Sequence, residues 1–316
     1  MADKIKIFID GREGTTGLRI DERLSGRDDT EQILIDPELR KDPAARAACI
    51  NASDVTFLCL PDAASVEAVA MVNNDRTRII DASTAHRTSP DWAYGLAELT
   101  GAREKIALSK RVAVPGCYAG GFVTIVAPLI EKGYLPADAA LCCHAISGYS
   151  GAGKKAIAQY GENPPELRAP RVYALTQQHK HLREMTQIPG LITPPVFCPI
   201  VTSYYSGMIV SVPLHVSQFY HRVTKEDLLE FYRDYYSGAR LIGVTDEASS
   251  EDGFISAEKF SGRDDLELLI TGNADRLVLT ARFDNLGKGA SGAAIQCFNL
   301  MTGADETKGL NLEATK

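Results

Sequence analysis

The sequence has no excess of positive charge and no long hydrophobic run. Lysine and arginine total 34 against 41 aspartate and glutamate residues, which gives a net charge of −7 over 316 residues. A nucleic acid or an anionic membrane would be repelled on average, so neither is expected as a partner. The longest apolar stretches, such as Phe122 to Ile130, fall far short of the roughly 20 residues that a membrane-spanning helix needs. These absences predict a soluble protein.

Paired cysteines and a leader segment are also missing. None of the seven cysteines stands in a Cys-x-x-Cys pair, and the adjacent Cys142 and Cys143 are too close for an easy mutual disulfide. Reduced thiols are therefore expected. The N-terminus passes from Met1 through a charged segment directly into the apolar run Ile5–Ile9, which leaves no room for a signal or transit peptide. We expect a cytoplasmic protein in which one thiol is free to do chemistry.

The composition is that of an ordinary folded chain, with 45% hydrophobic and 24% charged residues, and the length suggests two domains. In the first third, short apolar runs alternate with helical patterns, which is typical of a parallel sheet covered by helices. The predicted strands are Lys4–Ile9, Gln32–Ile35, Asp54–Leu60 and Arg78–Asp81, and the predicted helices include Leu18–Leu24 and Ser65–Val72. This pattern predicts an α/β nucleotide-binding domain of the Rossmann type.

Beyond residue 115 the pattern changes to strands with alternating polar and apolar residues, which indicates sheets with one solvated face. The predicted strands are Ala140–Ile146, Ile200–Val216, Leu266–Thr271 and Arg276–Phe283. A helix begins after Thr224, which opens a capping-box sequence, and a last helix covers roughly residues 290–301. We expect a second, α+β domain with a mixed or antiparallel sheet.

A glycine-rich turn follows the first strand and opens the first helix. Glycines at such a turn let the backbone approach a pyrophosphate, whose charge is stabilised by the free N–H groups at the helix N-terminus. An ordinary turn is the alternative, but the position after the first strand favours a dinucleotide site. The candidate cofactor-binding residues here are Gly11, Arg12, Gly14, Thr15, Thr16 and Gly17.

The residues leave the choice between NAD and NADP open. Asp36 ends the second strand 19 residues after Gly17, where an acid would bind a ribose 2′-hydroxyl and favour NAD. Arg12, Arg40 and Lys41 are nearby cations that could instead receive the 2′-phosphate of NADP. Asp36 is equally well explained as a turn residue before a proline.

Cys117 is the candidate nucleophile. It follows Pro115-Gly116 and precedes an apolar helical face, so we expect it at a helix N-terminus. The dipole and the free N–H groups of a helix start stabilise a thiolate, and the same N–H groups can hold an oxyanion. The other cysteines in apolar or helical contexts are expected to be structural. These are Cys49, Cys59, Cys142, Cys143 and Cys297.

Two histidines lie within three residues at His179-Lys180-His181. If a helix begins there, Glu184 lies three residues after His181 and can orient its ring, which would leave the other nitrogen to exchange a proton. A solvated turn is one alternative. A metal site is another, since His-x-His is a ligand spacing on a strand. No convincing third ligand is near, so we predict no metal.

Two further loops carry polar candidates. Arg87 follows the fourth predicted strand, where ligands gather in parallel sheets, and is either an anion-binding fork or a solvent-facing side chain. The Gly/Ser-rich loop from Ser147 to Lys155 has the composition of a phosphate cradle but not the spacing of a P-loop. Its lysines could neutralise a substrate phosphate.

A nucleotide domain, a thiolate and a histidine together indicate hydride transfer through a covalent sulfur intermediate. A thiolate does not readily attack an unactivated carboxylate, so an acyl phosphate is the natural substrate. Displacement of phosphate gives a thioester, and hydride transfer gives a thiohemiacetal that collapses to an aldehyde.

The motifs, in their order along the chain, resemble those of N-acetyl-γ-glutamyl-phosphate reductases of the shorter form. They are Gly11–Gly17, Phe57–Asp62, Val114–Tyr118, Ser147–Gly153, His179–Glu184 and Asn285–Gly289. The resemblance implies that NADPH reduces N-acetyl-glutamyl 5-phosphate to the semialdehyde plus phosphate in arginine biosynthesis. It also implies a fold like aspartate-semialdehyde dehydrogenase and a homodimer or homotetramer. Residues 1–115 with 285–316 would bind NADP, and residues 116–284 would form the catalytic and dimerisation domain.

The resemblance also implies roles for individual residues. Cys117 would be the nucleophile, His181 or His179 the acid/base, and Glu184 its orienter. The remaining assignments are Arg87, Ser147 and Lys154 at the substrate and Pro61, Ser83, Gly148 and Asn285 at the cofactor, beside the glycine-rich turn and Asp36.

Glu13, Thr15 and His86 depart from the commoner long form, and Asp36 is an awkward residue for NADP. We assign NADP on the resemblance, with NAD as the alternative. An aspartate-semialdehyde dehydrogenase and a non-catalytic dinucleotide sensor are the rival functions.

Overall fold

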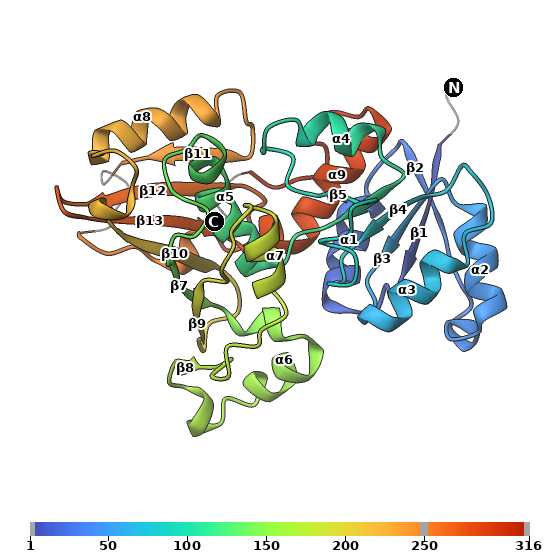
Figure 1. The fold of residues 1–316 in the computed structure, drawn as a ribbon. Helices are drawn as coiled ribbons and strands as arrows, with labels where there is room; N and C mark the ends of the chain where they lie inside the picture. The colour runs from blue at the N-terminus through green and yellow to red at the C-terminus, as the bar shows by residue number, and fades with distance from the viewer. Residues whose placement is uncertain (1–3, 247–251, 313–316) are drawn as a thin grey trace. The chain divides into compact units, whose positions relative to one another are not determined.

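The computed structural model describes residues 4–246 and 252–312 (Figure 1). The chain forms two compact units. The first unit contains the chain up to Pro115 together with Ala290–Leu310, and the second contains Gly116–Gly289 and the chain from Asn311. Contacts thus divide the chain after Gly289, whereas the predicted boundary stands at residue 285.

The first unit contains a six-stranded sheet in the order β2-β1-β3-β4-β6-β5, and every neighbouring pair in it is parallel. This confirms the predicted Rossmann-type sheet. The strand Arg78–Asp81 has the predicted bounds. The two short strands β5 and β6 at one edge of the sheet were not predicted. The strands are β1 Ile5–Asp10, β2 Thr30–Ile33, β3 Val55–Leu58, β4 Arg78–Asp81, β5 Ala93–Tyr94 and β6 Arg111–Ala113.

Helices cover both faces of this sheet. Successive side chains of a strand point to opposite faces, so neighbouring residues of β1 pack in different clusters. Ile7 and Ile9 pack in a cluster with residues of α1, α4 and α9. Phe8, between them, packs in a second cluster with residues of α2 and α3. The helices of this unit are α1 Thr15–Ser25, α2 Pro43–Ala52, α3 Asp62–Ala70, α4 Ala102–Leu108 and α9 Gly292–Thr302.

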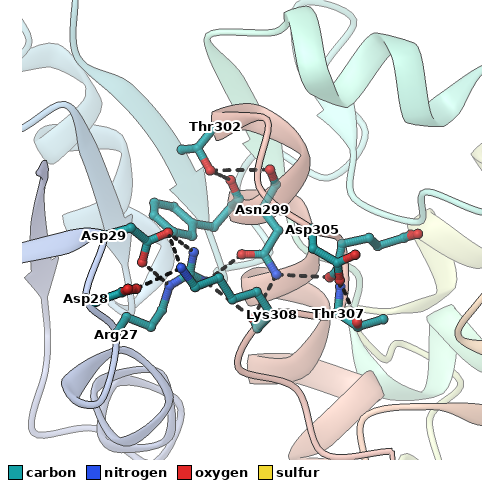
Figure 2. A network of polar contacts seen from close by, with 10 residues as sticks. Arg27, Asp28, Asp29, Asn299, Thr302, Asp305, Thr307 and Lys308 are labelled. Atoms are coloured by element: carbon teal, nitrogen blue, oxygen red, sulfur yellow. Dashed lines mark hydrogen bonds and ion pairs between the residues drawn. The ribbon is translucent and has the colours of Figure 1, made fainter. Parts of the chain in front are cut away.

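A polar network that runs from a buried hydrogen bond to the surface holds the last helix to the segment after the first one (Figure 2). Arg27, just after α1, donates to Asn299 Oδ1 of α9 at 2.5 Å and forms a two-pronged ion pair with Asp29 at 2.8 and 2.9 Å. Lys308 adds ion pairs to Asp28 at 2.9 Å and to Asp29 at 3.0 Å. The Arg27 hydrogen bond holds the pKa of the Asp29 carboxyl well below its usual value. The C-terminal segment therefore completes the fold of the first unit.

The second unit contains a seven-stranded mixed sheet in the order β11-β12-β13-β10-β7-β9-β8. The β7–β9 and β11–β12 pairs are parallel and the others antiparallel, which confirms the predicted mixed sheet. The strands are β7 Cys142–Ser147, β8 Arg171–Val172, β9 Val196–Val201, β10 Met208–His215, β11 Ile242–Thr245, β12 Leu266–Gly272 and β13 Arg276–Phe283.

The prediction of one long strand over Ile200–Val216 was wrong, because the chain turns between β9 and β10. Gly207 adopts a φ of +105°, and a Cβ there would lie 2.3 Å from the carbonyl oxygen of Ala257. This left-handed backbone with its close approach requires glycine and breaks the strand in two.

The helices α5, α7 and α8 pack against the mixed sheet. Their apolar side chains pack with inward residues of β10, β12 and β13, such as Val210, Leu268 and Leu279. The capping box predicted at Thr224 is present, since its hydroxyl accepts from Asp227 N at 3.1 Å and Asp227 Oδ2 accepts from Thr224 N at 2.8 Å. The helices of this unit are α5 Cys117–Glu131, α6 Lys154–Gly161, α7 Leu182–Gln187 and α8 Lys225–Tyr235.

Short irregular turns complete the described chain. Among its helices, none is long and apolar enough to cross a membrane. All seven cysteines lie in the described residues, and no disulfide joins any two of them. The 3₁₀ helices are Pro37–Leu39, Tyr149–Ala152, Pro165–Leu167, Val216–Gln218 and Ala257–Phe260, and Gly287–Ser291 forms one turn of π-helix.

Candidate active site

Cys117 is the first residue of α5, where the sequence placed it. Gly116 is the N-cap of this helix. The thiol is half-buried, so it combines access with the positive end of a 15-residue helix. Gly289 packs closely beside it, since a Cβ at that position would lie 2.9 Å from Cys117 Cβ. The structure therefore gives this cysteine the surroundings in which a thiolate is stabilised.

Glu184 is bound to the start of the same helix. Its Oε2 accepts a hydrogen bond of 2.8 Å from the backbone N–H of Gly116, and the carboxyl group is buried. Sequence reasoning expected Glu184 to orient His181. The hydrogen bond shows that Glu184 fixes the backbone of the residue before Cys117.

The two histidines have different environments. His181 is the N-cap of α7 and is only 5% exposed. Its backbone N–H donates to Nδ1 of His179 at 3.2 Å, so Nδ1 of His179 is an acceptor and carries no proton. Burial, with a smaller contribution from the Lys180 charge, lowers the pKa of His179 to about 4. His179 is therefore neutral near pH 7.

Aromatic rings link these histidines to the cysteine segment. The ring of Tyr118 lies 6.0 Å from that of His181 and 6.3 Å from that of His179, and Tyr173 lies 5.9 Å from His179. The hydroxyls of Tyr118 and Tyr173 are hydrogen-bonded to each other. Burial raises the pKa of Tyr173, and the charge of a Cys117 thiolate raises it further. The cysteine and histidine motifs thus meet in one cluster, in which Tyr173 is a member that sequence reasoning missed.

Gln177 holds the histidine segment against the neighbouring strand. Its side-chain Nε2 donates to the carbonyl of Phe197 at 2.7 Å, and its Oε1 accepts from the N–H of Phe197 at 2.8 Å. Gln177 itself has a φ of +56°, in the left-handed region. Sequence reasoning missed this residue because its partner lies 20 positions later, in β9, and no local pattern marks the contact.

The Gly/Ser-rich loop after β7 is fixed by backbone hydrogen bonds to residues 204–207 and by Asn285. Its amide donates to Ser150 Oγ at 2.9 Å and accepts from Gly207 N at 3.0 Å. Gly148 admits no side chain, because a Cβ would lie 2.5 Å from the carbonyl oxygen of Tyr205. Ser147 is buried at the end of β7, whereas Lys154 is exposed at the start of α6.

Arg87 and Ser83 belong to the first unit and follow β4. The guanidinium of Arg87 is buried and donates through Nε to the carbonyl of Val114 at 2.8 Å and through Nη2 to that of Ala82 at 3.0 Å. The Ser83 hydroxyl donates to Asp81 Oδ2 at 2.7 Å. Both side chains are therefore held rigidly at the carboxyl end of the parallel sheet.

The first unit contains a cavity of about 520 Å³ at the carboxyl ends of β1 and β2. A Cβ at Gly11 would lie 2.4 Å from the carbonyl oxygen of Cys59, and one at Gly17 would lie 2.5 Å from that of Gly11. The buried hydroxyl of Thr15, at the first position of α1, has no hydrogen-bond partner within residues 4–246 and 252–312. This tight turn at a helix start fits a dinucleotide pyrophosphate. The lining includes Gly11, Arg12, Glu13, Gly14, Leu18, Asp21, Leu34, Ile35, Arg40, Lys41 and Pro61.

The lining of this cavity carries both cations and acids. Arg12, Arg40 and Lys41 all line it. Asp36 is not among the described lining residues. Its carboxylate accepts from Glu38 N at 2.9 Å, which caps the short turn that follows. The described residues hold no group of three or more side chains arranged to bind a metal ion.

The sequence and the fold match known proteins. Residues 9–109 match the family described as semialdehyde dehydrogenase, NAD binding domain, and residues 117–285 match semialdehyde dehydrogenase, dimerisation domain. The chain is 43% identical to N-acetyl-gamma-glutamyl-phosphate reductase 2 of Pseudomonas putida, covering 96% of this chain and 98% of that one. It is 45% identical to N-acetyl-gamma-glutamyl-phosphate reductase of Brucella suis, covering 95% and 99%.

Solved structures show the same fold at low sequence identity. Aspartate semialdehyde dehydrogenase II of Vibrio cholerae matches with a TM-score of 0.71 and 13% identity over 95% of this chain and 99% of that one. Aspartate semialdehyde dehydrogenase with NADP from Candida albicans matches with a TM-score of 0.61 and 16% identity over 95% and 99%. By its sequence over nearly its full length, the chain belongs to the N-acetyl-γ-glutamyl-phosphate reductase family.

Proposed function

We propose that this chain uses NADPH to reduce N-acetyl-γ-glutamyl phosphate to N-acetylglutamate semialdehyde and phosphate, a step of arginine biosynthesis. The observation that carries the proposal is the position of Cys117 at the start of α5. Gly116 ties it to Glu184, and the ring of Tyr118 joins it to the buried His181 and the half-buried His179. This arrangement supports a thiolate beside a proton carrier. The family membership supplies the substrate class.

Cys117 is the nucleophile of the proposed reaction. Its thiolate attacks the acyl carbon of the substrate, the C–O bond to phosphate breaks, and a thioester forms on the sulfur. The first N–H groups of a helix have no partner within the helix. Those at the start of α5 are therefore suited to stabilise the negative charge that develops on the carbonyl oxygen.

When NADPH is bound, it supplies the hydride that reduces the thioester carbon. The residues that would hold the cofactor are those of the glycine-rich turn, namely Gly11, Arg12, Gly14, Thr15, Thr16 and Gly17, together with Pro61, Ser83, Gly148 and Asn285. The cavity beside α1 and the orphaned Thr15 hydroxyl support the first of these positions. The capping contact of Asp36 supports a turn role for that residue and removes its conflict with NADP.

His181 is the proposed acid/base and His179 its positioning residue. A histidine with a pKa of about 4 stays neutral near pH 7, and its Nδ1 is already occupied by the His181 N–H. His179 is therefore poorly suited to take up and return a proton, which leaves His181 for that task. His181 would protonate the product oxygen or accept its proton as the thiohemiacetal collapses to aldehyde and thiolate.

The substrate anions are assigned to Arg87, Ser147 and Lys154. The two fixed donors of Arg87 support a rigid guanidinium at the end of the parallel sheet.

We further propose that residues 1–115 with 285–316 bind the dinucleotide and that residues 116–284 carry catalysis and self-association, as a homodimer or homotetramer in the cytosol. The lack of disulfides among the seven cysteines, all of which are described, supports a reducing compartment.

A steady-state assay in the reverse direction tests the function. The purified protein is given NADP⁺, phosphate and either N-acetylglutamate semialdehyde or aspartate semialdehyde, and NADPH is followed by absorbance. We expect phosphate-dependent reduction of NADP⁺ with the acetylated semialdehyde, and at most a trace with the other. Preference for aspartate semialdehyde would assign the rival dehydrogenase function instead.

A further inference from the structure

We propose that Glu13 is a specificity-determining residue of the cofactor site, which weakens the hold of Arg40 on the 2′-phosphate and so limits the preference for NADPH over NADH. The inference rests on the proposed use of NADPH. It concerns a residue that would touch the adenosine end of the cofactor and no reacting atom.

The carboxylate of Glu13 lies directly on the Arg40 guanidinium. Arg40 Nη1 is 2.9 Å from both Glu13 Oε1 and Glu13 Oε2, and both residues line the same cavity. The side chain of Arg40 is 51% exposed and that of Glu13 is 65% exposed. An ion pair this exposed contributes little stability, so Arg40 can exchange this partner for a phosphate.

The remaining charges of the cavity leave little spare positive charge. The lining contains three cations, Arg12, Arg40 and Lys41, and three acids, Asp10, Glu13 and Asp21. Arg12 is paired with Asp21 at 2.8 Å, and Asp10 is paired with the buried Arg46 at 2.9 Å. Of these three acids, Glu13 is therefore the one paired with Arg40, a cation that could receive the 2′-phosphate.

A bound 2′-phosphate must displace Glu13 from Arg40 and then remain close to its negative charge. A cofactor without that phosphate has no such conflict. Loss of the Glu13 charge should therefore tighten binding of the phosphorylated dinucleotide selectively. Because the pair is exposed, we expect a tightening of about 3- to 5-fold, which diminishes as added salt screens the charges.

Isothermal titration calorimetry of the full chain without substrate tests this inference with NADP⁺ and NAD⁺ as the probes. Glu13→Gln keeps the size of the side chain and removes its charge. Glu22→Gln is the matched control, because it removes a charge of the same sign from α1 at an exposed residue that does not line the cavity. We expect Glu13→Gln to lower the Kd for NADP⁺ at least twofold more than that for NAD⁺, with no such difference in Glu22→Gln.

A change smaller than twofold in the ratio of the two Kd values, or an equal change in the control, would overturn the role of Glu13. The double variant Glu13→Gln/Arg40→Gln adds a second test, since the selective gain should vanish once Arg40 is gone. If the wild-type chain binds NAD⁺ as tightly as NADP⁺, the proposed cofactor itself is wrong, and that result is distinct from a failure of Glu13 alone.

Discussion

Glu184 Oε2 accepts a 2.8 Å hydrogen bond from the backbone N–H of Gly116, the residue that precedes Cys117. The contact joins α7, which begins directly after His181, to the start of α5, and so couples the histidine segment to the nucleophile segment. A buried N–H left without an acceptor costs about 1–3 kcal/mol, so this contact contributes to stability as well as to geometry.

Two replacements of Glu184 should therefore separate the loss of its negative charge from the loss of its hydrogen bond to Gly116. Glu184→Gln keeps an acceptor for Gly116 and should retain the fold, whereas Glu184→Ala should lower the free energy of unfolding by about 1–3 kcal/mol. We expect turnover to fall in both variants and further in the alanine variant. Urea unfolding and steady-state assays on the same preparations check this, and an alanine variant with wild-type stability and turnover would contradict it.

The two histidines should respond differently to the same substitution. His181→Asn should lower kcat by about 10²–10⁴-fold, the usual contribution of general acid–base catalysis, and should remove the histidine limb from the pH–rate profile. His179→Asn should lower kcat less and keep that limb, because His179 is already neutral. Profiles of kcat between pH 5.5 and 8.5 decide the matter. Loss of the limb only in His179→Asn would exchange the two roles.

His179 should also make the fold sensitive to acid. Its pKa is about 4 in the folded chain against 6.5 for an unperturbed histidine, so the unfolded state binds the proton more readily between these values. The stabilisation is fully present above about pH 6.5 and is lost as the pH falls through about 4. Denaturant unfolding at pH 7 and pH 5 should show a smaller loss of stability in His179→Gln than in the wild type. An equal loss in both proteins would refute this assignment.

Gln177 should act as a positioning residue for the histidine segment. Gln177→Ala removes both hydrogen bonds to the Phe197 backbone, whereas Gln177→Glu keeps the acceptor for the Phe197 N–H and loses the donor. We expect kcat to fall in the order wild type, glutamate, alanine, with the Kd for NADP⁺ unchanged because Gln177 is not among the residues proposed to hold the dinucleotide. A variant that loses cofactor affinity together with kcat would indicate a general loss of structure.

The parts of this protein that follow local rules were predictable from its sequence. The glycine-rich turn at Gly11, the helix start at Cys117 and the capping box at Thr224 depend on neighbours within a few residues, and the structure has each of them. The alternation of strands and helices up to β4 likewise defined the parallel sheet.

Long-range contacts account for what the sequence did not predict. Tyr173 and Gln177 gain their positions only when β9 aligns beside their loop, and the break at Gly207 depends on the approach of Ala257. Gly116 lies 68 residues before Glu184, so no local spacing indicated the hydrogen bond between them.

Formation of a covalent bond between the Cys117 sulfur and the substrate is the step on which the proposed reaction depends. Its most direct test is the turnover of Cys117→Ser with N-acetylglutamate semialdehyde, NADP⁺ and phosphate, measured beside calorimetric binding of NADP⁺ to the same protein. We predict that turnover falls by several orders of magnitude while the Kd for NADP⁺ stays at its wild-type value. Turnover close to that of the wild type would contradict the account.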